Sequence, residues 1–168
     1  EVGFEFLGYR VVKEPAWRTG RLVGKLRIPK GKLQSLRTRL KSKTDRSTTG
    51  LSLEALLRTI NPIIIGWRNY YRYATGAYKD FGSLDRWLWH RIRLWIKKKH
   101  KKSDSRTLQR RYERRETPTR CTWADGDTLL RRFTTGGTTR YRYRGTRISN
   151  GWNDELDQVC FYPEAAKA

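Results

Sequence analysis

The chain has 168 residues, of which 38 are Lys or Arg and 16 are Asp or Glu, so its formal net charge is +22. This length fits one domain or two small ones and permits a real hydrophobic core. Seven Trp and 12% aromatic residues exclude a simple disordered basic tail. Because the charge excess opposes compaction unless a partner neutralises it, we expect a folded domain that binds RNA or DNA, with an anionic membrane surface as the weaker alternative.

The remaining composition limits the class of protein further. No apolar run approaches the ~20 residues that cross a bilayer, and no secretory signal is visible. Cys121 and Cys160 make neither a disulfide framework nor a zinc pattern, so we expect both to be free and structural. The chain contains no Met and begins at Glu1, from which we expect a piece of a longer polypeptide whose other part could hold the chemistry.

The N-terminal residues predict a small antiparallel unit. Apolar residues alternate with others over residues 3–13, and Gly8 marks a turn, which indicates a short hairpin. Residues 22–28 show a second, weaker alternation that Gly24 interrupts. One face of this second strand would carry Leu22, Leu26 and Ile28, and the other Lys25 and Arg27.

Helical spacing begins after Pro29. Leucines three and four residues apart predict a first helix over 30–42, and the polar stretch from Ser42 to Gly50 predicts a loop. A second helix has Ser52 as a candidate N-cap. Its buried face would hold Leu53, Leu56, Leu57 and Ile60.

Pro62 predicts an interruption of that second helix. Asn61 would cap a new helix whose first position is Pro62, because a missing N–H costs nothing there. Gly76 would end this new helix. Its inward side chains would be Ile63, Ile64, Trp67, Tyr70 and Tyr71.

The next helix is expected to start near Ser83 and to show two stripes. Leu84, Leu88, Ile92 and Trp95 form the apolar stripe; Arg86, His90, Arg93 and Lys97 form the basic one. Cations at residues 97–102 suit a helix C-terminus.

The last third of the chain changes character. A short basic helix is predicted over 105–115, and Thr, Gly and aromatic residues dominate after Pro118. Asp125-Gly126 and Gly136-Gly137 are turn signals, so we expect a small antiparallel unit over 120–150. Strict alternation at residues 140–144 predicts one of its strands.

The basic residues on these helices are the candidate RNA-binding site. Most charge runs are solvated faces, but acidic residues for pairing are scarce in this chain. Arginine also offers a planar fork to phosphate. The candidate contacts to nucleic acid are Arg37, Lys41, Arg68, Arg72, Arg86, His90, Arg93, Lys97 and Lys98. The candidate core is Leu57, Trp67, Tyr71, Leu88 and Trp95.

Nothing in the sequence predicts a catalytic or metal site. Asp125 and Asp127 flank a glycine that a hairpin turn needs, so we interpret them as turn residues. His90 and His100 have no partner at metal-ligand spacing. We therefore expect no catalytic residue, no metal and no cofactor in this chain.

The stretch from Asn61 to Arg72 reads Asn-Pro-Ile-Ile-Ile-Gly-Trp-Arg-Asn-Tyr-Tyr-Arg, and Phe81, Leu84-Asp85-Arg86, Trp89 and Arg91 follow it. These uncommon residues in this order resemble the maturase-specific (thumb, or X) domain of group II intron reverse transcriptases. Phe6-Leu7-Gly8-Tyr9 resembles the primer grip that closes the palm of those enzymes, and Trp123-Ala124 with Asp125-Gly126 and Leu129 resembles the segment after the thumb.

The resemblance implies an α+β chain in three parts. Residues 1–28 would end the reverse-transcriptase palm with a primer-grip hairpin, residues 29–116 would form a three-helix thumb bundle, and residues 117–168 a small β-rich tail. The parent would be an RNA-directed DNA polymerase active in retrotransposition and in splicing of its intron. This chain would hold intron RNA and the RNA template with its DNA primer, and it would do no bond-making itself.

The same resemblance sets the expected surroundings of the chain. Mg²⁺ and the catalytic aspartates would belong to the palm, and finger and palm domains would be linked to or associated with this chain. Beyond Arg140 the sequence departs from the family, which usually has Arg-His and then Asn-Pro-Tyr-Asp, and the Cys- and His-rich endonuclease domain of some members has no counterpart here. We expect a bacterial cytoplasmic location in preference to an organelle, and no membrane.

Two alternatives stay open at this point. The chain could be a free-standing basic RNA-binding splicing cofactor without a polymerase, or the thumb of a reverse transcriptase repurposed for defence or repair. An authentic start codon near Glu1 would favour the first. An upstream Tyr/Phe-Ala-Asp-Asp motif in frame would indicate a polymerase.

Overall fold

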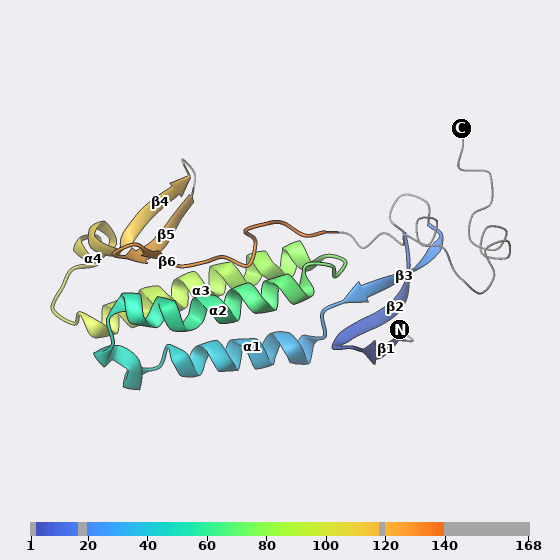
Figure 1. Ribbon diagram of the computed structural model, residues 1–168, viewed down its shortest axis with the longest axis horizontal. Coiled ribbons are helices and arrows are strands. Elements are labelled where there is room, and N and C mark those ends of the chain that lie inside the picture. Colours follow the sequence, from blue (N-terminus) through green and yellow to red (C-terminus); the bar gives the residue numbers. More distant parts are fainter. Residues whose placement is uncertain (1–2, 17–19, 118–119, 140–168) are drawn as a thin grey trace, which may run out of the picture.

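A computed structural model describes residues 3–16, 20–117 and 120–139. A layer of long helices lies between two small antiparallel sheets, one near each end (Figure 1). The predicted α+β class is therefore confirmed. In chain order the elements are β1 (Gly3–Phe6), β2 (Tyr9–Pro15), β3 (Leu22–Arg27), α1 (Lys30–Lys43), the 3-10 helix η1 (Arg46–Gly50), α2 (Leu53–Tyr71), α3 (Ala77–Lys99), α4 (Ser105–Tyr112), β4 (Glu113–Thr117), β5 (Arg120–Asp125) and β6 (Thr128–Leu129).

The N-terminal sheet has the order β1-β2-β3, and β1 and β2 form the predicted hairpin. Its two-residue turn places Leu7 at φ 46° and Gly8 at φ 73°. Two consecutive positive φ values match the twist that tight hairpins need. The expected second strand, β3, pairs antiparallel with β2, so Val11 lies opposite Leu26.

Helix α2 is continuous from Leu53 to Tyr71 and contains Pro62, so the predicted break is wrong. Asn61 does not cap a helix. Its side-chain amide donates to the Leu129 carbonyl over 2.8 Å, and its side-chain oxygen accepts from the Arg131 N–H over 2.9 Å. Ile60 and Ile64 are fully buried on either side of the proline. Packing of this face stabilises the helix by more than the missing hydrogen bond costs it.

Helix α3 begins at Ala77, more than a turn before the predicted start at Ser83. The apolar stripe extends upstream, since Ala77 and Phe81 are both buried. Gly76, expected to end the preceding helix, instead precedes α3 with φ 80°. Packing of two extra apolar residues thus decides the helix start, and Ser83 lies within the helix.

Helix α1 confirms the predicted first helix and buries Leu36 and Leu40. The polar stretch predicted as a loop contains η1, which contacts α3. The predicted short basic helix is present as α4, which ends at Tyr112, in addition to the three long helices α1, α2 and α3 of the predicted bundle. No helix among the described residues is long and apolar enough to cross a membrane.

The C-terminal sheet begins at Glu113, before Pro118, and continues into the predicted antiparallel unit. Both turn signals are confirmed: Gly126 has φ 57° between β5 and β6, and Gly136 and Gly137 have φ 88° and 67°. The strand predicted at residues 140–144 lies outside the described residues.

One hydrophobic core joins the helices to the C-terminal sheet and to the segment after it, and the partly buried Tyr9 of β2 packs against this core. It includes Ile28 after the first sheet, Phe81 on α3, Trp123 on β5 and Phe133 after β6. The segment that follows β6 runs along the helices towards the N-terminal sheet (Figure 1). The Asp85 carboxylate on α3 holds it there, accepting from the Phe133 N–H over 2.7 Å and from the Thr134 N–H and hydroxyl over 3.1 and 2.7 Å.

Candidate nucleic-acid interface

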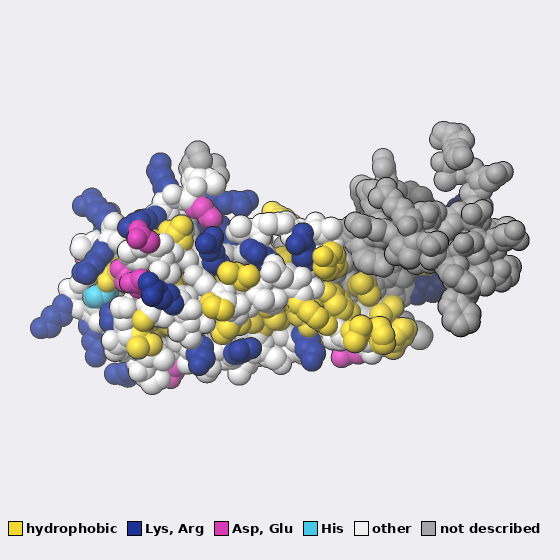
Figure 2. Space-filling view, viewed as in Figure 1, with side chains coloured by type: hydrophobic (Ala, Val, Ile, Leu, Met, Phe, Trp, Pro, Cys, Tyr) yellow, Lys and Arg dark blue, Asp and Glu magenta, His cyan; other side chains and the backbone are white. Residues whose placement is uncertain are grey.

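The basic stripe predicted on α3 lies on its exposed face. Arg86, His90, Arg93 and Lys97 are all exposed, while Leu88, Ile92 and other side chains of the opposite face are buried. The side chains of Arg86, Arg93, Lys97 and the adjacent Lys98 have no hydrogen-bond or ion-pair partner within the described ranges. We call Arg86, His90, Arg93, Lys97 and Lys98 the α3 stripe. Lys and Arg side chains gather at the end of the molecule that carries α4 and the C-terminal end of α3 (Figure 2).

Two further cations of α3 have structural partners instead. Arg91 donates to the Thr44 hydroxyl over 3.0 Å and to the Thr44 carbonyl over 3.2 Å. Lys99 donates to the carbonyls of Thr49 and Leu51 over 3.0 and 2.7 Å. These residues lie on the side of α3 that faces η1, whereas the α3 stripe faces solvent.

Arg37 and Lys41 on α1 differ in the same respect: one has a structural partner and the other is exposed. The Arg37 guanidinium donates to the Ser83 hydroxyl on α3 over 3.3 Å, and its Nε is buried with no partner among the described residues. Lys41 is exposed. Only Lys41 of this pair therefore presents its charge to solvent in the manner of the α3 stripe.

Arg68 and Arg72 lie against the C-terminal segment. Arg72 donates to the Thr139 hydroxyl over 2.7 Å, and its carbonyl accepts from the Thr139 N–H over 3.0 Å. The Arg68 guanidinium comes within 4.0 Å of where a Cβ at Gly136 would lie. Both arginines are half-buried. The structure thus places this predicted pair beside residues 136–139 and not with the exposed cations of α3.

The hairpin turn that resembles a primer grip is held by three tyrosines. The Tyr70 hydroxyl donates to the Leu7 carbonyl, the Tyr71 hydroxyl to the Gly8 carbonyl over 3.3 Å, and the Tyr9 hydroxyl to the Tyr70 carbonyl. Tyr9 and Tyr70 also stack with ring centroids 5.3 Å apart. Burial and the neighbouring tyrosines raise the pKa of Tyr9 to about 12, so its hydroxyl stays protonated and can donate.

These contacts change the expected role of Tyr70. It was predicted to point into the core, but it is 48% exposed and packs on the hairpin instead. The reason is its position in the last turn of α2, beside the N-terminal sheet. Phe6 and Leu7, the apolar residues of the turn, stay exposed at 61% and 71%.

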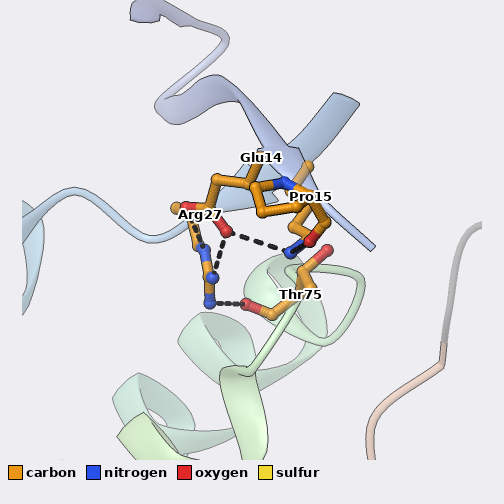
Figure 3. Close-up of polar contacts among 5 residues, drawn as sticks. Glu14, Pro15, Arg27 and Thr75 are labelled. Carbon is orange, nitrogen blue, oxygen red and sulfur yellow. Dashed lines mark hydrogen bonds and ion pairs between the residues drawn. The ribbon is translucent and has the colours of Figure 1, made fainter. Parts of the chain in front are cut away.

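A second set of contacts fixes the sheet to the helices (Figure 3). Arg27 on β3 forms an ion pair with Glu14 over 2.6 Å and donates to the Thr75 carbonyl between α2 and α3 over 3.2 Å. Lys25 donates to the same Glu14 carboxylate over 3.1 Å. Hydrogen bonds from Arg27 and Lys25 lower the pKa of Glu14. The orientation of the hairpin relative to the bundle is therefore defined by side chains, not by the connecting backbone alone.

The residues assigned to the core belong to one hydrophobic cluster or pack against it. Tyr71 and Trp95 are buried, as are Leu57 and Leu88. Trp67 is partly buried, and its ring centroid lies 4.4 Å from that of Tyr71 and 5.7 Å from that of Phe133.

Sequence reasoning missed Trp123, which is buried and donates its indole N–H to the Trp89 carbonyl over 3.0 Å. It also missed the structural role of Asp85. The available signal for Asp85 was an acidic residue in the interior of a helix rich in Lys and Arg.

Two of the polar residues weighed for chemistry, Asp125 and His100, have structural partners. The Asp125 carboxylate accepts from the Glu54 N–H at the start of α2 over 3.2 Å. His100 lies 3.0 Å from the Tyr112 hydroxyl, and burial lowers the pKa of its imidazole. Across the described residues, no group of three or more His, Cys, Asp or Glu is placed to hold a metal ion.

Comparison with protein families places part of the chain in a known family. The family model described as "Group II intron, maturase-specific domain" matches residues 33–113, from within α1 to the first residue of β4. No curated protein matches the chain. The matched range contains η1, α2, α3, α4 and the whole α3 stripe.

Proposed function

We propose that the α3 stripe binds the phosphates of the intron RNA. The premise is that residues 33–113 are a group II intron maturase-specific domain, with a maturase-related role in splicing. The observation that carries this proposal is the contrast between the cations of one helix. Arg91 is bonded to Thr44 at the end of α1 and Lys99 to Thr49 of η1, whereas Arg86, Arg93 and Lys97 have no partner among the described residues.

The geometry of the stripe suits a polyanion. Arg86 and Lys97 are separated by eleven positions, about 16 Å at a rise of ~1.5 Å per residue, which is long enough to meet several phosphates of one strand. Arginine forks bind phosphate oxygens in bidentate fashion, and lysine adds a point charge. Such contacts release counterions and supply affinity without requiring a particular base sequence.

The finer part of the proposal concerns DNA synthesis. We propose that the hairpin around Phe6 and Leu7 lies at the primer end in a longer reverse transcriptase, with the Tyr70 and Tyr71 hydroxyls holding its turn. Mg²⁺ and the catalytic carboxylates would then belong to a palm domain. Primer extension tests this division: the full-length parent should extend a primer on RNA, and extension by this chain alone would contradict it.

A charge-reversal variant tests the RNA-binding face. Arg86→Glu with Arg93→Glu should weaken binding of the intron RNA by ~100-fold or more, because each hydrogen bond to a charged group contributes ~1.5–3 kcal/mol. Filter binding at fixed salt measures the affinity. Circular dichroism should show an unchanged fold, since both side chains are exposed.

Lys13→Glu with Lys30→Glu is the matched control. Both lysines are exposed near the N-terminal sheet, and the change in net charge is the same. The control should weaken binding only slightly. An equal loss of affinity in the two variants would mean that net charge, and not a defined face of α3, carries the binding.

A further inference from the structure

A surface hollow of about 550 Å³ lies beside the α3 stripe. It is lined by Arg46 and Thr49 of η1, by Leu94, Lys97 and Lys98 of α3, and by Lys101. Leu94 is 54% exposed and provides an apolar contact surface among four cations. The stripe and the hollow share Lys97 and Lys98, so a ligand on one can extend into the other.

The η1 wall of the hollow is anchored to α3 by three side chains spaced one turn apart. Arg91 bonds to Thr44 just before η1, Lys99 bonds to the carbonyls of Thr49 and Leu51, and between them the Trp95 indole N–H donates to the Thr48 hydroxyl over 3.0 Å. A wall held at both ends and in the middle keeps its shape before a ligand arrives. This preorganisation reduces the entropy cost of binding.

The chemistry of the lining selects the ligand class. The side chains of Arg46, Lys97, Lys98 and Lys101 have no hydrogen-bond or ion-pair partner among the described residues, and no carboxylate lines the hollow. The site therefore favours an anion. The exposed leucine also favours a flat apolar group next to that anion, because burying both removes apolar surface from water. Nucleotides combine these two features, and the volume lies within the ~300–1,000 Å³ of small-molecule sites.

We propose that the hollow takes one unpaired nucleotide of the RNA, with its base against Leu94 and its phosphates on the surrounding cations. A paired base cannot meet Leu94, because its faces are stacked inside the duplex, whereas bases in bulges and loops can be splayed out onto a protein surface. This inference rests on the proposed RNA binding by the α3 stripe. It adds that an unpaired nucleotide is recognised beside the stripe.

Two RNA hairpins of equal length test the proposal, one fully paired and one with a single bulged uridine. The protein should bind the bulged hairpin about 5- to 10-fold more tightly. Leu94→Ser should abolish this preference and leave affinity for the paired hairpin unchanged. Leu22→Ser, at a leucine that is 61% exposed on β3, is the matched control and should keep the preference.

A photo-crosslink gives a readout that does not depend on affinity. A 4-thiouridine at the bulge should crosslink to residues 94–101 or 46–49, and a crosslink only to other segments would overturn the proposal. Equal binding of the two hairpins by the unaltered protein would overturn it too, while leaving RNA binding by the stripe intact if Arg86→Glu with Arg93→Glu still weakens both.

Two other outcomes separate the hollow from the function of the stripe. If neither hairpin binds, the proposed function fails together with the inference. If Leu94→Ser leaves the preference for the bulge unchanged but abolishes binding to vesicles of anionic phospholipid, the hollow is a lipid-headgroup site and the nucleotide assignment is wrong.

Discussion

The cations of α3 show that neighbouring residues of the same type can have opposite roles. Arg91 and Arg93 are two positions apart, yet Arg91 is bonded to Thr44 and Arg93 is exposed without a partner in the described structure. In a helix, two positions correspond to more than half a turn, so the side chains point to different faces. Which arginine meets Thr44 is decided by the side of α3 on which the end of α1 and η1 pack.

Trp95 connects the core to η1, so its replacement should lower the stability of the protein. It is 2% exposed and donates to Thr48. We predict that Trp95→Ala lowers the free energy of unfolding by ~3–5 kcal/mol, measured by urea denaturation, because a large cavity remains.

Trp95→Phe is the matched control for packing. It keeps most of the ring volume but loses the indole donor, so it should cost less than the alanine variant, with ~1–3 kcal/mol of the loss arising from the bond to Thr48. An unfolding curve of Trp95→Ala that matched the unaltered protein would show that Trp95 contributes nothing to the core.

At the scale of elements, α2 binds two distant segments of the chain, which its own sequence pattern does not indicate. Its middle binds the C-terminal segment through Asn61, and its last turn holds the hairpin turn through Tyr70 and Tyr71. Pro62 sits between these contacts in the helix interior. A proline at this position removes a backbone hydrogen-bond donor. The helix is retained because packing of its faces against other elements compensates for that loss.

Replacing that proline should stabilise the protein. Pro62→Ala restores the backbone donor and removes the ring, and we predict a gain of ~1–3 kcal/mol in the free energy of unfolding. Urea denaturation measures it. Gly66→Ala on the same helix is the reference, since its Cβ would meet open space and should add ~0.5–1 kcal/mol. A destabilised Pro62→Ala would indicate that the proline ring itself is needed, for example against α1.

At the scale of the whole molecule, a net charge of +22 is compatible with folding because no Lys or Arg in the described part of the chain is buried in the apolar core. Figure 2 shows the two kinds of surface: hydrophobic side chains towards the N-terminal sheet and Lys and Arg at the other end. Phe4 and Phe6 of β1 and Leu7 of the hairpin turn are exposed.

Affinity for RNA should therefore depend steeply on salt. If ~6–10 phosphates are contacted, we predict that affinity falls ~10³–10⁵-fold between about 50 and 200 mM salt. The reason is that the release of counterions from the RNA becomes less favourable as the salt concentration rises. A titration of affinity against salt concentration measures the slope. Binding that stayed constant over this range would refute an electrostatic interface. The Arg86→Glu, Arg93→Glu variant should show a shallower slope than the unaltered protein.

The helices and strands were largely predictable because their signals are local. Leucines at helical spacing indicated α1 and the first half of α2, and turn glycines indicated the hairpins at Gly8 and Gly126. The errors came where distant residues intervene. Asn61 looks like a cap in the sequence, but its partners are Leu129 and Arg131.

The candidate site was predictable in composition but not in arrangement. The spacing of Arg86, His90, Arg93 and Lys97 was enough to place them on one helix face. No local pattern could show that Arg68 and Arg72 meet residues 136–139, or that η1 forms a wall beside Leu94. Those contacts join residues far apart in the chain.

By itself, the sequence determined the class of the fold, the periodic faces of its helices, the excess of positive charge and the resemblance to a maturase-specific domain. Only the tertiary structure decided which cations are available to a ligand, where α2 and α3 begin and end, and how the hairpin is held. The physical reason is that periodicity and charge are properties of neighbouring residues, whereas burial and hydrogen-bond pairing depend on which distant surfaces meet.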